Sequence, residues 1–193
     1  MFDNLFQLIV LFFVIFDPFI SFSVFFIATK DMVARERTKT AFFAVLVAAV
    51  ISYAFLIFGN GVLTLFATSM NDFKASAGII LGILGIKMVL GQPITNTDNL
   101  KNNSGKAIAA IIGTPLLTGP AAITTIIVSV NDYGRLQTSI AIAVVLIFSF
   151  LLLHFSSKIY KYLGMTTIQV ISTILGLITI SWGVKFIKAG FGL

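Results

Sequence analysis

Asp17 is the residue whose type and position most clearly suggest chemistry, because it lies inside a long apolar run. Residues 5–27 contain no other charged side chain. A carboxylate near the centre of a bilayer costs about 2.5–3.5 kcal/mol on insertion scales, so such residues usually face a partner or a cavity. Burial disfavours the charged form, which allows Asp17 to take up and release a proton. The alternative is a helix cap, since Asp before Pro is a favoured helix start, and the two roles are compatible.

Prolines interrupt two apolar runs near their middles. Pro18 removes a backbone donor and clashes with the preceding turn, so residues 17–23 are predicted to contain a helix break with two nearby hydroxyls, Ser21 and Ser23. Residues 113–125 contain two prolines, two glycines and four threonines, which predicts two half-helices joined by an unwound stretch. A kinked helix whose threonines bond their own backbone is the alternative here.

Two such breaks together suit a zwitterion. The N-terminus of a half-helix presents free N–H groups and a partial positive charge, which attracts a carboxylate. Asp, Ser and Thr oxygens suit an ammonium group, a proton or Na⁺. Asp17 is therefore predicted to hold the ammonium or the coupling ion. The candidate substrate-binding residues are Asp17, Pro18, Ser21, Ser23, Thr114, Thr118, Gly119, Pro120 and Thr124.

The composition indicates a polytopic membrane protein. Of 193 residues, 58% are hydrophobic and 10% are charged, where a soluble domain carries roughly 25% charged residues. Cysteine is absent and His154 is the single histidine, which excludes disulfides, thiolate chemistry and a multi-histidine metal site within one chain, so we expect no metal and no cofactor. The net charge of +6 lies in short loops and reflects membrane orientation better than nucleic-acid binding.

Six windows reach the length that a bilayer core requires, so the expected fold is an all-α protein with six transmembrane helices. The windows are residues 5–27, 40–58, 75–91, 107–130, 137–156 and 167–188. The triplet Gly59-Asn60-Gly61 is expected to break the second apolar region and to leave residues 62–70 as an interfacial or re-entrant piece.

The loop charges predict the orientation. The loops after the first, third and fifth windows carry eight Lys and Arg residues: Lys30, Arg35, Arg37, Lys39, Lys101, Lys106, Lys158 and Lys161. The opposite side carries three: Lys74, Arg135 and Lys188. The positive-inside rule places the eight in the cytoplasm and both termini outside.

The two halves of the chain resemble each other. Asp17-Pro18 and Gly119-Pro120 each lie near the middle of a window, and the third and sixth windows both end in a Gly-hydrophobic-Lys motif, at 85–89 and 183–187. The alternative is that apolar segments resemble one another by composition. Gly78, Gly82 and Gly85 in the third window, and Ser172, Gly176 and Gly183 in the sixth, form small-residue faces that favour close helix packing.

Three windows in each half force the second half to enter the membrane from the opposite side. This is the inverted-repeat plan of many secondary transporters, with the first and fourth helices discontinuous at midspan. The expected division is residues 1–91, a polar loop at 92–106, and residues 107–193. A second register, which pairs 80–82 with 174–176, differs by four residues and stays open.

At these motifs the sequence resembles the MarC/SnatA family of prokaryotic inner-membrane proteins. The resemblance covers nearly the whole chain and rests on Phe16-Asp17-Pro18, on the stretch PLLTGPAAIT at 115–124 and on the two Gly-hydrophobic-Lys endings. It implies a six-helix inverted-repeat fold and, in the SnatA branch, transport of small neutral amino acids such as glycine and alanine. The family usually has Asn where Asp17 stands, and often small or helix-breaking residues in place of Ile20, Ser21 and Ser23, which bears on coupling and substrate.

We therefore expect an ion-coupled symporter of small neutral amino acids in the inner membrane, working by alternating access. Its partners would be the amino acid, a proton or Na⁺, and lipid, without nucleic acid; the oligomeric state is open. An enzyme is not expected, because the chain lacks a second midspan acid, H-E-x-x-H and Gly-x-Ser-x-Gly. The alternatives are a cation channel in which Asp17 selects ions, or an exporter of another small metabolite or drug.

Overall fold

In the computed structural model, residues 2–65, 67–92 and 104–193 are described, and this part of the chain is helical with short connections. Helices are the expected form for these apolar segments, because a helix satisfies its backbone hydrogen bonds internally where no water is available. The first half contains α1 (Phe2–Phe16), α2 (Pro18–Thr29), α3 (Ala34–Leu65) and α4 (Met70–Val89). The second half contains α5 (Gly105–Ile111), the wide helical turn η1 (Ile112–Leu117), α6 (Pro120–Tyr133), α7 (Arg135–His154) and α8 (Ser156–Gly190).

Four segments are long and apolar enough to cross a membrane within the part of the chain that is described. They are Asn4–Thr29, Ala34–Gly59, Arg135–His154 and Thr166–Gly190. A fifth crossing is present if Gly105–Leu117 and Pro120–Tyr133, which meet at an angle of 54°, count as one broken span. The window at 75–91 lies mostly in α4, which is not among these segments, so the sixth span stays a prediction.

The predicted break at Gly59-Asn60-Gly61 is wrong, because α3 continues through all three residues to Leu65. A single glycine costs a helix only about 1 kcal/mol, which packing can offset. At Gly59 the packing leaves no room for a side chain, because a Cβ atom there would lie 2.5 Å from Cγ1 of Ile127 in α6. The glycine allows α3 and α6 to approach closely and does not mark a turn. The predicted polar loop at 92–106 ends in the first turn of α5, and its residues 93–103 lie outside the described part.

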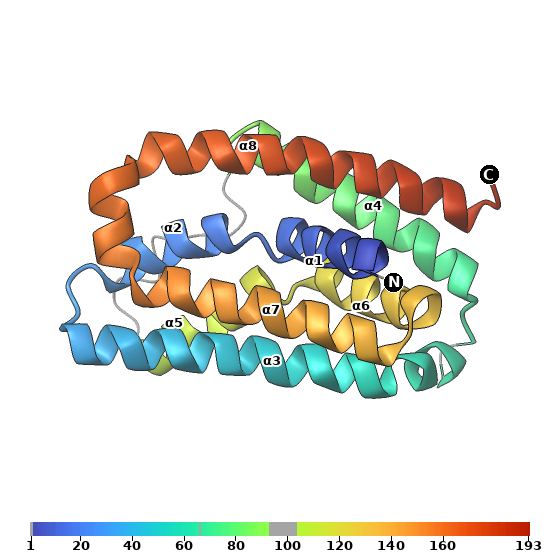
Figure 1. The fold of residues 1–193 in the computed structure, drawn as a ribbon, viewed down its shortest axis with the longest axis horizontal. Helices are drawn as coiled ribbons and strands as arrows, with labels where there is room; N and C mark the ends of the chain where they lie inside the picture. Colours follow the sequence, from blue (N-terminus) through green and yellow to red (C-terminus); the bar gives the residue numbers. More distant parts are fainter. Residues whose placement is uncertain (1, 66, 93–103) are drawn as a thin grey trace.

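The helices form an elongated bundle (Figure 1). α3 and α7 pack together on one side, α4 and α8 on the other, and α1 and α2 contact both α7 and α8. Both ends of the chain lie at the end of the bundle where α1 begins and α8 finishes.

α4 and α8 meet along the predicted small-residue faces. A Cβ atom on Gly78 would lie 2.5 Å from the carbonyl oxygen of Gly183, and one on Gly85 would lie 2.6 Å from the carbonyl oxygen of Gly176. The two backbones are therefore in direct contact, and the packing role predicted for these glycines is confirmed.

The segment that carries Asp17 is the most enclosed of the apolar segments. Two-thirds of its most apolar stretch is buried inside the bundle, at 67%, against 28% for Ala34–Gly59. Phe12, Phe16, Phe22 and Phe25 are fully buried on either side of the break. Asp17 consequently faces protein and not lipid.

Candidate functional site

The first break consists of one residue, Asp17, between α1 and α2. Its backbone is left-handed, with φ 37° and ψ 72°, and this interrupts the helix between α1 and α2. Its Oδ1 accepts a hydrogen bond from the Ile20 N–H at 3.2 Å, and Pro18 occupies the first position of α2. The capping role that the Asp-Pro pair predicts is therefore confirmed.

The second oxygen of Asp17 reaches α8. Ser172 donates its hydroxyl to Oδ2 of Asp17 at 3.3 Å, and the carboxylate side chain is buried, with 5% of the residue exposed. Sequence reasoning placed Ser172 on a packing face and missed this role. The signal was weak, because a serine among glycines on an apolar helix is typical of close packing.

The second break lies between η1 and α6, at Thr118 and Gly119. Gly119 is extended, with φ −87° and ψ −179°, and Pro120 is the first residue of α6. A Cβ atom on Gly119 would lie 2.6 Å from the carbonyl oxygen of Pro115, so glycine is required for this close approach. The helix interruption that the prolines predict is thus present at both positions.

The two helix starts differ in their caps. α2 is capped by the Asp17 carboxylate, whereas no side chain caps α6. The first backbone hydrogen bond of α6 runs from the Ile123 N–H to the Gly119 carbonyl at 3.0 Å. The N–H groups of Ala121 and Ala122 come before that bond, so they can donate to a ligand at the start of the helix.

Both breaks face one cavity of about 220 Å³. It combines a carboxylate and a hydroxyl from the first break with an open helix start from the second, and the rest of its wall is mostly apolar. Its polar and break residues are Asp17, Ser21, Gly119 and Pro120, and its apolar lining includes Ile15, Ile20, Ile80, Leu84 and Leu116. Four of the nine predicted site residues therefore lie together.

Ser21 has a hydroxyl that is buried without a hydrogen-bond partner among the described residues. The residue is 1% exposed and lines the cavity. An unsatisfied buried hydroxyl is unfavourable by about 1–3 kcal/mol, so a ligand that accepts or donates here gains a ready partner. The hydroxyl of Thr114 is also buried without a partner in the described part, but Thr114 is not among the residues that line the cavity.

The remaining predicted site residues point elsewhere. Thr118 donates to the Ala48 carbonyl at 3.2 Å, and its Oγ1 lies 3.5 Å from Oγ of Ser52, so it connects the second break to α3. Thr124 donates to the carbonyls of Pro120 and Ala121 in its own helix at 2.9 and 3.0 Å, as the kinked-helix alternative predicts. Pro18 and Ser23 do not line the cavity either. Substrate binding by these nine residues stays a prediction.

The contribution of α4 to the cavity could not be predicted from the sequence. Ile80 and Leu84 of α4 provide part of the cavity wall. They are apolar residues in an apolar helix, and such residues look alike whether they face lipid, core or a ligand.

Comparison with known proteins gives one consistent family. The chain matches the sequence model of the MarC family integral membrane proteins over residues 2–192. A UPF0056 membrane protein of Buchnera aphidicola subsp. Baizongia pistaciae is 34% identical over 188 residues, covering 92% of this chain and 87% of that one. The UPF0056 membrane protein YhcE of Escherichia coli is 30% identical over 176 residues, covering 86% and 82%. A relative from Methanocaldococcus jannaschii is 30% identical over 186 residues, covering 92% and 91%. No solved structure matches the chain significantly.

Proposed function

Because this chain belongs to the MarC family of integral membrane proteins, we propose that it is a secondary transporter of small neutral amino acids such as glycine and alanine. One observation carries the proposal: two helix breaks from different halves of the chain line the same cavity. One break supplies a buried carboxylate and the other supplies an uncapped helix start. Discontinuous helices that meet near the bilayer midplane are typical of secondary transporters.

The two breaks match the two charges of an amino acid. The substrate carboxylate would accept hydrogen bonds from the N–H groups at the start of α6, where the helix dipole is positive. The ammonium group would lie near Asp17 and the free hydroxyl of Ser21. The cavity of about 220 Å³ has mainly apolar walls, which favours a substrate with a short apolar side chain.

The glycine contacts between α4 and α8 support an inverted repeat. A register that pairs Gly85 with Gly183 also pairs Gly78 with Gly176. A two-fold axis would then turn the contact between Gly78 and Gly183 into one between Gly176 and Gly85, and both contacts are present.

The other register is less consistent with these contacts. It pairs Gly82 with Gly176, which would pair Gly78 with Ser172 and would not map the two glycine contacts onto each other. We therefore propose the first register, with six spans in two inverted halves and with α4 as the third span. Transport would proceed by alternating access as one half rocks against the other.

We further propose that Asp17 binds a coupling proton or Na⁺ together with the substrate, and that the protein carries out no enzymatic reaction. The proposed location is the cytoplasmic (inner) membrane, with both termini outside. These assignments make uptake dependent on an ion gradient, which can be measured directly.

The test is uptake of labelled glycine and alanine by liposomes that contain the purified chain, with and without an imposed pH or Na⁺ gradient. We expect accumulation that follows one gradient. We expect Ser21→Ala to raise KM about tenfold, because a hydrogen bond to a charged group contributes about 1.5 kcal/mol. The matched control is Ser181→Ala, whose exposed hydroxyl bonds the Leu177 carbonyl of its own helix at 3.0 Å.

Three outcomes are informative. Gradient-driven uptake that weakens in Ser21→Ala and not in Ser181→Ala supports the proposal. Absence of amino-acid uptake by folded protein would overturn it. Ion currents larger than carrier turnover allows would favour the channel alternative instead.

A further inference from the structure

A second, smaller cavity lies at the end of the bundle where α4 begins and where α6 and α8 finish. Its volume is about 60 Å³, and it is lined by residues of α1, α4, α6 and α8. The residues used below are Lys74, Ser129, Asp132, Trp182 and Lys185. None of them belongs to the cavity between the two helix breaks.

Three charged side chains line this cavity, and their charges do not cancel. Lys74 and Asp132 form an ion pair, with Nζ 2.9 Å from Oδ1, and their side chains are 17% and 35% exposed. Lys185 lies over the ring of Trp182, with Nζ 4.2 Å from the ring centroid. Among the described residues no carboxylate is within ion-pair distance of Lys185. One positive charge therefore remains unbalanced at the cavity.

Ser129 adds an unused donor to this positive site. The residue is 1% exposed, and its hydroxyl has no hydrogen-bond partner within the described part of the chain. Buried hydroxyls are normally paired, so an unpaired one on a cavity wall indicates a missing partner. A cavity needs about 10–15 Å³ to hold one water molecule, so a cavity of about 60 Å³ leaves room for a small ion.

We propose that this cavity binds a small monovalent anion, either chloride or the carboxylate group of a small organic molecule. The anion would accept a hydrogen bond from Ser129 and would balance the charge of Lys185. A cation fits less well, because the single carboxylate of the cavity, Asp132, is already paired with Lys74 and is also within 3.4 Å of the Asn131 amide. The proposal does not depend on amino-acid transport.

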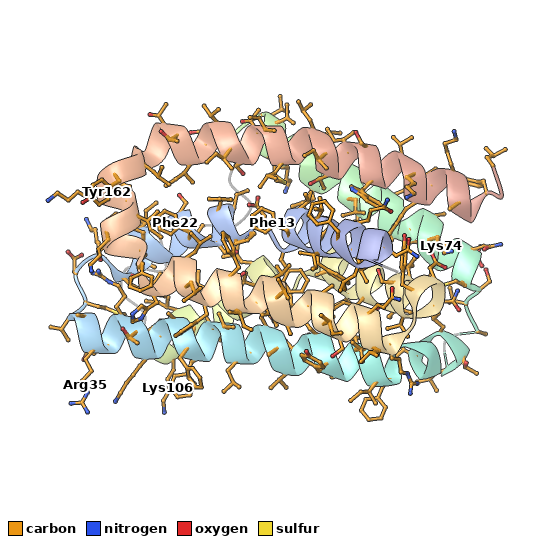
Figure 2. All side chains as sticks on the ribbon, in the orientation of Figure 1. Phe13, Phe22, Arg35, Lys74, Lys106 and Tyr162 are labelled. Atoms are coloured by element: carbon orange, nitrogen blue, oxygen red, sulfur yellow. The ribbon has the colours of Figure 1, made fainter. Side chains whose placement is uncertain are left out.

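Figure 2 shows Lys74 at this end of the bundle, away from Arg35 and Lys106 at the opposite end. An anion between Lys74 and Lys185 would contact α4 and α8 as well as Ser129 of α6. It would therefore link elements from both halves of the chain.

Trp182 provides the experiment with its own reporter, because it is the single tryptophan in the sequence and it lines the cavity. The fluorescence of the full chain in lipid nanodiscs would be titrated with sodium chloride, sodium acetate and glycine. Sodium gluconate, whose anion is too large for the cavity, would keep the ionic strength constant. We expect a saturable change with chloride or acetate.

The variants separate a specific site from general salt effects. Ser129→Ala and Lys185→Gln should each weaken anion binding about tenfold, the loss expected for one hydrogen bond to a charged group. Two matched controls should bind as the unchanged protein does. Ser181→Ala removes a hydroxyl beside Trp182 that bonds its own helix. Lys87→Gln removes the lysine of α4 that pairs with Lys185 in the register proposed above. Thermal unfolding of each variant, with and without the anion, checks folding and reports binding independently.

The outcomes are distinct. Saturation by chloride or acetate alone assigns the site to free anions, and additional saturation by glycine assigns it to amino-acid carboxylates as well. No saturable change in the unchanged protein would overturn the proposal. Equal affinity in Ser129→Ala, Lys185→Gln and the controls would also overturn it.

Discussion

Asp17 combines two roles that are usually separate. As a cap it must accept from the Ile20 N–H, and it adopts a left-handed backbone that residues other than glycine rarely adopt. As a buried carboxylate it also accepts from Ser172 of α8 and faces the larger cavity. Backbone strain of this kind persists where the surrounding structure holds it and is often found at functional sites.

Substitution of Asp17 can separate the charge from the cap. Asp17→Asn keeps an oxygen for the Ile20 N–H, so we expect the fold to remain while gradient-driven accumulation of substrate falls at least tenfold. Asp17→Ala should in addition lower the free energy of unfolding by about 1 kcal/mol through loss of the cap. Liposome uptake and thermal unfolding measure the two effects, with the exposed Asp31→Asn as the control. Normal gradient coupling in Asp17→Asn would remove Asp17 from the ion site.

Thr118 is expected to act on stability. Its buried hydroxyl donates to the Ala48 carbonyl, so Thr118→Val should lower the free energy of unfolding by about 1 kcal/mol. Thr173→Val is the matched control, because that exposed hydroxyl bonds the Gln169 carbonyl of its own helix. Denaturant unfolding of the two variants in detergent compares them. Equal stabilities would show that the contact with α3 contributes nothing measurable.

At the level of elements, the break in the second half is anchored to a different partner from the break in the first. The first is tied to α8 through Ser172, and the second is tied to α3 through Thr118. α4 and α8 in turn are held together by backbone contact at glycines, where side chains would separate the helices. Helices whose backbones touch at glycines can form a rigid pair, and α4 supplies part of the cavity wall.

The glycines of α4 allow a matched test of that pair. Gly78→Ala and Gly85→Ala place a Cβ atom 2.5–2.6 Å from a carbonyl oxygen of α8, so each should destabilise the protein by about 1–3 kcal/mol. Gly82→Ala has no heavy atom within 4 Å of its new Cβ atom and should be neutral or slightly stabilising, since alanine favours a helix. Thermal unfolding would rank the three variants. A loss in Gly82→Ala as large as in the others would contradict the packing interpretation.

At the scale of the whole molecule, the distribution of positive charge and the positions of the two chain ends favour the same orientation in the membrane. The chain begins and ends at one end of the bundle, and Arg35 and Lys106 lie at the other end with much of the positive charge (Figures 1 and 2). Such an asymmetry orients a membrane protein with the positive end in the cytoplasm. The proposed six spans would likewise place both termini on one side of the membrane.

The absence of cysteine makes the orientation easy to measure. Single cysteines would be introduced at two exposed positions, as Arg35→Cys and Lys188→Cys. In right-side-out membrane vesicles we expect a membrane-impermeant maleimide to label position 188 directly and position 35 only after permeabilisation. The reverse pattern would invert the proposed orientation, and labelling of both positions from one side would contradict the proposed six spans.

The sequence alone determined the features that depend on local chemistry. Hydropathy fixed the membrane class, because an apolar helix of sufficient length satisfies its own backbone wherever it lies. Pro18 and Pro120 located both breaks, because a proline lacks the N–H that a helix interior needs. The glycine spacing identified the faces of α4 and α8 that pack.

Only the tertiary structure decided which segments meet and where each side chain points. It brought Asp17, Ser21 and Gly119 to one cavity, yet turned Thr118 and Thr124 toward backbone carbonyls. The physical reason is that a hydroxyl can satisfy itself within its own helix, against a neighbouring helix or with a ligand at similar free energy. The choice among these depends on packing between residues far apart in the chain, which local sequence does not encode.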